Sequence, residues 1–290
     1  MRYIVFLTDA IHRETENIMP QWRIETPQSL DLEGVQRLEV RMVAGNVDVV
    51  GRTEDAESGA AQVEVSELEG PLTVTLENGT LTIVHERLTW GGIFDWVGSR
   101  KASATVSVSV PHTCPVELGV VSADAVVSGI EAPRTAVKSV SGDVTLDGVR
   151  SDISAQTVSG DLESRQLAGT LKFHTVSGDL TVVAGRSDQV KAETVSGDLT
   201  LDLDLLAGGR IDVSSVSGDL TVRMPETVGL TVDVKTMSGS LDSAFSGVHS
   251  ERKPGKSSMR GTVGDGDGRL SAKTVSGDVT LLRRASNGSA

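Results

Sequence analysis

The chain has little of what builds a disulfide-bonded, proline-rich or aromatic protein. Its 290 residues include one cysteine, 8 prolines and 3% aromatic residues. Cys114 cannot form an internal disulfide, so the sequence gives no sign of an oxidising compartment and favours a cytoplasmic location. With so few rings, Val, Leu, Ile, Ala and Thr must fill the core, and these residues suit pleated strands.

Long apolar runs and basic clusters are also scarce. No stretch approaches the roughly 20 apolar residues of a membrane helix. The apolar start at residues 3–7 is too short for a signal sequence, because Asp9 and His12 follow it. We therefore treat residues 1–18 as an extension, with Met19 as an alternative start. The net charge of −13 repels a phosphate backbone, so we expect no nucleic-acid partner.

Glycine, in contrast, is abundant at 31 residues, and it marks an internal repeat. The tetrad Val-Ser-Gly-Asp recurs with spacings between neighbouring glycines of 18 to 21 residues, followed by a longer step to the last copy. Degenerate copies lie at 43–46, 121–124 and 237–240. We predict structural turns at Gly142, Asp143, Gly160, Asp161, Gly178, Asp179, Gly197, Asp198, Gly218, Asp219, Gly277 and Asp278.

The repeat predicts an all-β fold. Each unit holds two short strands with one apolar face, and that face is buried only if successive units stack in register. The expected architecture is a single-chain β-solenoid with coils of about 18–21 residues. In each turn, Gly is expected to supply a positive φ, and Ser and Asp to bond amides of their own turn.

The chain divides into unequal parts. Residues 19–110 are predicted to form a less regular, β-rich N-terminal cap, with strand-like runs at 38–50, 61–66, 72–76 and 81–85, and an aromatic loop at 88–101. Asn78-Gly79 predicts a type I′ hairpin turn. Residues 111–284 are expected to form the repeat solenoid, interrupted by a protruding loop at 243–268, and 285–290 are expected to form a disordered tail.

The aromatic loop is the least repeat-like segment, since it holds two of the three tryptophans. It is interpreted either as a capping loop over the end of the core or as an exposed patch for a protein groove or membrane surface. The candidate interaction surface comprises Trp90, Ile93, Phe94, Trp96, Arg100 and Lys101.

Catalytic and metal chemistry find little support. Stacked turn aspartates could bind Ca²⁺, but one Asp per coil and a variable coil length favour a turn role. The segment 264–268, Gly-Asp-Gly-Asp-Gly, lacks the further acidic ligand of an EF-hand. The five histidines and Cys114 show no metal-ligand spacing. We predict no catalytic residue, no cofactor and no metal.

The serial Thr-Val-Ser-Gly-Asp-Leu-Thr units, with Gly-Asp-Gly-Asp-Gly-Arg-Leu at 264–270 and Val-Ser-Gly-Asp-Val-Thr-Leu-Leu at 275–282, resemble a bacterial family of domains of unknown function labelled "putative adhesin". The similarity runs from Trp22 to Arg284. It implies a β-solenoid without established catalytic residues, and some relatives are linked to cell-envelope stress.

These observations favour a non-catalytic scaffold or protein-interaction module that binds a protein partner or itself. The alternative is an adhesin-like protein that binds a glycan or a surface. A glycan-active β-helix enzyme is disfavoured, because such a cleft needs aromatic residues for sugar stacking.

Overall fold

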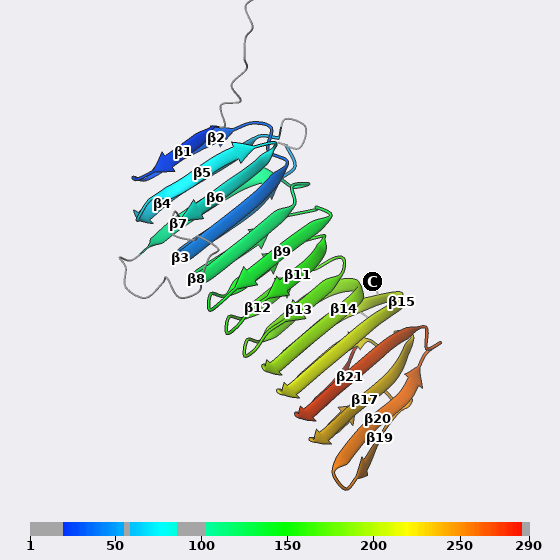
Figure 1. Ribbon diagram of the computed structural model, residues 1–290. Coiled ribbons are helices and arrows are strands. Elements are labelled where there is room, and N and C mark those ends of the chain that lie inside the picture. Colours follow the sequence, from blue (N-terminus) through cyan, green and yellow to red (C-terminus); the bar gives the residue numbers. More distant parts are fainter. Residues whose placement is uncertain (1–19, 55–58, 86–101, 286–290) are drawn as a thin grey trace, which may run out of the picture.

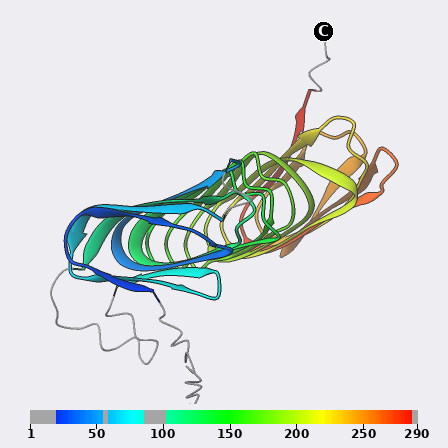
Figure 2. The same ribbon diagram turned by 90° about the horizontal axis from the view of Figure 1, so that it is seen from above.

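The computed structural model describes residues 20–54, 59–85 and 102–285, which form an elongated β-solenoid (Figure 1). Seen from above, its coils are flattened rings that follow one another along the rod (Figure 2). The predicted all-β solenoid is therefore confirmed. None of the described residues forms a helix with the length and apolar character that membrane crossing requires.

The strands lie on two faces. Along the first face they pair in the order β1 (Gln21–Ile24), β5 (Leu72–Glu77), β6 (Thr80–His85), β3 (Arg37–Arg52), β8 (Val116–Ser128), β9 (Arg134–Ser139), β11 (Asp152–Gln156), β13 (Leu171–His174), β14 (Leu180–Ser196), β15 (Leu199–Ser217), β21 (Gly268–Ser276), β17 (Leu230–Ser238), β20 (Lys256–Val263) and β19 (Val248–Lys253).

Along the second face the order is β2 (Gln28–Leu32), β4 (Ala61–Glu69), β7 (Ser103–Pro111), β3, β8, β10 (Val144–Asp147), β12 (Leu162–Arg165), β14, β15, β16 (Leu220–Pro225), β22 (Val279–Arg284) and β18 (Leu241–Ser243). The long strands β3, β8, β14 and β15 contribute to both faces.

The core lies between the faces and is built by period-two alternation. In β7, for example, Ala104, Val106 and Val108 are buried, and the residues between them are partly exposed. Because the coils stack in register, like residues lie on like residues: Leu162 pairs with Leu180, which pairs with Leu199. A stack of similar aliphatic side chains fills most of the narrow core, with Phe173 and Phe245 as its buried phenyl rings.

The N-terminal part bears out its predicted strands. All four runs are found, as β3, β4, β5 and β6. Asn78 and Gly79 join β5 to β6 with φ of 48° and 76°, the paired positive values of a type I′ turn. The degenerate copy at 43–46 is also in register with the repeat, since Gly45 pairs with Ala123 and Asn46 with Asp124.

The order of coils departs from the order of the sequence near the C-terminus. Strands β21 and β22, the last repeat, insert between the coil of β15 and β16 and the coil of β17 and β18. Figure 1 shows β21 between β15 and β17. The expectation that the coils stack in the order of the sequence was therefore wrong. The far edge of β17 is instead occupied by β20, which pairs with it antiparallel.

The predicted protruding loop at 243–268 was also wrong, because most of it is a hairpin. Strands β19 and β20 pair antiparallel around a turn in which Gly255 has a φ of 72°. Ser257 and Met259 of β20 point inward and are buried. The hairpin ends the first face with β19, whose charged residues suit an exposed strand edge.

Candidate functional site

The repeated turns lie one above another along one edge of the rod, which we call the turn edge. Register fixes this alignment: Ser196 pairs with Ser217, Ser217 with Ser276, and Ser276 with Ser238. Six turns place a valine, a serine, a glycine and an aspartate at equivalent positions of their coils, and the degenerate copy at 237–240 places Met, Ser, Gly and Ser there. Along the rod these become parallel rows.

Glycine is required in the turns for close approach. A Cβ on Gly160, Gly178 or Gly197 would lie well under 3.0 Å from the carbonyl oxygen of the glycine one coil before. Among the predicted turn glycines only Gly218 has a positive φ, of 133°. The expectation that these glycines supply positive φ was therefore wrong for the others, because the constraint is the backbone of the neighbouring coil.

The turn aspartates bond from coil to coil. Oδ1 of Asp143 accepts from the amide of Asp161 at 3.0 Å, and Oδ1 of Asp161 accepts from the amide of Asp179 at 2.8 Å. The same bond recurs along the whole series. We call this series the aspartate row; it comprises Asp124, Asp143, Asp161, Asp179, Asp198, Asp219 and Asp278.

Capping within one turn is done by a different residue. The buried hydroxyls of Ser139 and Thr175, three residues before the glycine, accept from the amides of Gly142 and Gly178 at 3.0 and 2.9 Å. The expectation that each Asp caps its own turn was therefore wrong. The carboxylate of a turn aspartate lies closer to the amide of the next coil than to the amides of its own turn, so it bonds from coil to coil.

The valines of the turns are exposed. Seven residues at this position keep between 45% and 61% of their surface accessible. We call them the valine row; it comprises Val140, Val158, Val176, Val195, Val216, Val275 and Met237. The row runs beside the aspartate row, so the turn edge presents an apolar line next to an anionic line. The sequence contained this signal, because each valine has the outward-facing parity of the strand that leads into its turn.

The predicted aromatic surface (Trp90, Ile93, Phe94, Trp96, Arg100 and Lys101) lies outside the described residues. It stays a prediction. In sequence it lies between β6 and β7.

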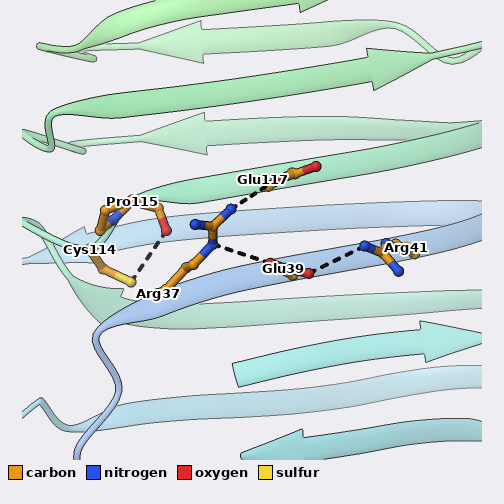
Figure 3. A network of polar contacts seen from close by, with 6 residues as sticks. All are labelled: Arg37, Glu39, Arg41, Cys114, Pro115 and Glu117. Carbon is orange, nitrogen blue, oxygen red and sulfur yellow. Dashed lines mark hydrogen bonds and ion pairs between the residues drawn. The ribbon is translucent and has the colours of Figure 1, made fainter. Parts of the chain in front are cut away.

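Cys114 lies under a surface ion-pair network (Figure 3). Arg37 bonds Glu117 at 3.0 Å and Glu39 at 3.2 Å, which links β3 to β8. Burial raises the pKa of the Cys114 thiol to about 12, although the positive charge of Arg37 opposes that rise. A buried, protonated thiol is a poor nucleophile.

The described histidines and the Gly-Asp-Gly-Asp-Gly segment hold no evident ligand site. No group of three or more potential metal ligands occurs within the described ranges. Asp265 accepts from the amide of Asp267 at 3.2 Å, which closes the turn between β20 and β21. His85 is buried, and its Nδ1 accepts from the amide of Val43 at 3.2 Å, so the hydrogen is on Nε2.

An ion-pair cluster fixes the inserted last coil. Arg284 of β22 bonds Oδ1 of Asp202 at 2.6 Å and also bonds Asp204, both on β15. Arg223 of β16, the strand between them, bonds the second oxygen of Asp202 at 2.5 Å. The cluster therefore joins β15 to β22, which are separated by about 80 residues in the sequence and flank β16 on the second face.

The chain is similar to a known domain family and to several solved structures. A family model described as Toastrack DUF4097 matches residues 35–282. A "putative adhesin" from Bacteroides fragilis is 12% identical, covers 89% of this chain and 98% of its own, and has a TM-score of 0.47. A "putative adhesin" from Parabacteroides distasonis is 13% identical, with coverage of 89% and 96% and a TM-score of 0.43. A "putative lipid binding protein" from the same species is 12% identical, with coverage of 89% and 97% and a TM-score of 0.40. No curated protein matches the chain.

Proposed function

The chain belongs to the Toastrack DUF4097 family, and from that premise we propose that it is a non-catalytic β-solenoid module that presents its long, ordered surfaces to a protein partner. The observation that carries the proposal is the turn edge. There, exposed valines and exposed aspartates form two parallel rows that nothing in the described chain covers. A regular apolar and charged surface of this length suits recognition.

The chemistry of the described residues supports a binding role over a catalytic one. The turn aspartates use one carboxylate oxygen each to hold the next coil. Burial raises the pKa of Cys114 and lowers that of His85, so the thiol and the imidazole are both held in their neutral forms. Neutral, enclosed side chains of this kind favour packing over proton transfer.

Site-specific photo-crosslinking tests the proposal. A benzophenone amino acid is introduced at Val176 on the turn edge, at Val126 on the second face or at Lys172 on the first face, all three exposed. Irradiation of cells that produce the protein is expected to give a discrete adduct with another protein from at least one position. Protein that stays free at all three positions would contradict the proposal; non-irradiated cells are the control.

The other functional predictions need separate experiments. Cell fractionation distinguishes the cytoplasmic location predicted from the sequence from an adhesin-like role at the surface. Replacement of Trp90, Phe94 and Trp96 together by Ala shows whether the aromatic segment contributes to any adduct. Deletion of the gene followed by growth under cell-wall antibiotics tests the predicted link to cell-envelope stress.

A further inference from the structure

We propose that the turn edge docks a cationic, amphipathic α-helix of a partner protein, with the helix axis along the rod. Its apolar stripe would lie on the valine row and its lysines or arginines on the aspartate row. This inference rests on the proposed function and specifies the partner and the surface. Three observations carry it: the valines are exposed, the aspartates carry a charge that the stacking of the coils does not require, and the spacing of the coils is close to the pitch of a helix.

The exposed valines contribute little to the core of the solenoid. Val158, Val176 and Val195 keep 47%, 50% and 49% of their surface accessible, whereas the leucines that follow each turn, such as Leu180, are fully buried. A polar residue would occupy the same corner without loss of core packing. An apolar side chain at this position in seven stacked turns forms a continuous apolar line, and such lines mark interaction surfaces.

The charge of the aspartate row is also more than the fold requires. The bond between coils needs one acceptor oxygen, which an asparagine also supplies. Asn46 stands in register with Asp124, so the stack accommodates the neutral residue. Like charges about 4.8 Å apart repel each other, even at an exposed edge. A cationic partner removes this repulsion and supplies the reason for an uninterrupted anionic row.

The spacing of the coils favours a helix. Neighbouring turns are separated by about 4.8 Å, the distance between paired strands. An α-helix advances 5.4 Å per turn, a mismatch of about 0.6 Å per coil, which long lysine and arginine side chains can absorb. An extended strand returns to the same face only every 6.6 Å or so and loses register sooner. The two rows coincide on six turns. Six turns span about 24 Å, which corresponds to a helix of roughly 16 residues.

A defined peptide tests the proposal. The probe is a fluorescein-labelled peptide of about 20 residues with leucines on one helical stripe and lysines on the adjacent stripe. Fluorescence anisotropy measures its affinity for the full chain at low and at physiological salt. A peptide of the same composition, scrambled so that no stripe forms, is the control. The striped peptide is expected to bind at least about 10-fold more tightly than the scrambled one, with an affinity that falls as salt rises.

Three variants assign the surface. Val158→Ser, Val176→Ser and Val195→Ser combined should weaken binding about 10-fold or more. Asp161→Asn, Asp179→Asn and Asp198→Asn combined should weaken it similarly and flatten its salt dependence, while keeping the acceptors between coils. Val50→Ser, Val126→Ser and Val183→Ser combined, on valines exposed by 40% to 44% elsewhere, are the matched control and should change affinity less than twofold.

Several results would overturn the proposal. These are no preference for the striped peptide, unchanged affinity in both turn-edge variants, or an equal loss in the control variant. A dimer in light scattering that the valine variant dissociates would assign the edge to a second copy of the chain. Binding to anionic vesicles that the same variant abolishes would assign it to a membrane. If photo-crosslinking still gives protein adducts when one of these results is obtained, only the helical partner is ruled out. The proposed function as a protein-binding module is then retained.

Discussion

The backbone amide of Asp179 donates a hydrogen bond of 2.8 Å to Oδ1 of Asp161, one coil earlier in the rod. The two residues are 18 positions apart in the sequence, so the bond is a contact between coils and not a cap within a turn. Its repetition along the aspartate row ties each turn to the next at the outer corner of the solenoid.

Asp161→Ala should therefore destabilise the protein, while Asp161→Asn should not. The alanine leaves the exposed amide of Asp179 to water and should lower the free energy of unfolding by about 1 kcal/mol. The asparagine keeps the acceptor and removes one charge from a row of like charges, so stability should stay the same or rise. Urea unfolding of both variants measures the difference. Equal losses would show that the charge, and not the acceptor, stabilises the stack.

Gly178→Ala should be among the most damaging single changes in the rod. The new Cβ would collide with the carbonyl oxygen of Gly160, and backbone in a stacked coil cannot move aside. We expect a loss of about 3 kcal/mol or more in urea unfolding. Gly119→Ala is the control, since its nearest neighbour would be Arg41 Cγ at 3.8 Å. That variant should unfold within about 0.5 kcal/mol of the wild type.

The sequence predicts the fold better than it predicts the roles of individual residues. The spacing of Gly142, Gly160 and Gly178 specifies stacked coils, because only register brings like residues together. It does not reveal that these glycines are needed for close approach, since the clash partner lies one coil away. The same limit applies to Asp161, whose acceptor role depends on a neighbour that the local sequence does not contain.

The insertion of the last coil could not be predicted from the repeat. The tetrad at 275–278 has the same residues as the other copies, and no neighbouring residue in the sequence indicates which coil it joins. The choice is made by pairing at a distance: β20 occupies the outer edge of β17, and Arg284 reaches Asp202. The valine row, in contrast, could have been found, because each Val has the outward-facing parity of the strand before its turn.

Arg284→Ala should loosen the inserted coil. The change removes the bonds to Asp202 and Asp204, but Arg223 still pairs with Asp202, so the expected loss is about 1 to 2 kcal/mol. In this variant, hydrogen exchange should become faster at the amides of β22 than in the wild type, while exchange at the amides of β12 should change less. The control is Arg283→Ala, whose pair with Glu226 is exposed at both ends and should be worth less than about 1 kcal/mol. Matching effects from the two arginines would mean that the cluster does not hold the coil.

Burial of His85 makes the stability of the fold depend on pH. Desolvation lowers its pKa in the folded state below the ordinary value of 6.5. Above that value the imidazole is neutral in both the folded and the unfolded chain and contributes no pH dependence. Below it the unfolded chain takes up the proton first, so the free energy of unfolding should fall as pH drops from 6.5 toward the lowered pKa.

The contribution of His85 can be separated from that of the carboxylates. Three carboxylates also have lowered pKa values, caused chiefly by hydrogen bonds: Glu193 to Lys191, Asp233 to Lys235 and Asp278 to the Ser240 amide. The stability that they contribute to the folded protein is lost only at more acidic pH. Urea unfolding between pH 8 and about 5.5 therefore isolates the histidine. His85→Gln should be less stable than the wild type at pH 8, because Nδ1 no longer accepts from Val43, yet lose less stability on acidification. Parallel pH curves for the two proteins would show that this imidazole is protonated as easily in the folded chain as in the unfolded one.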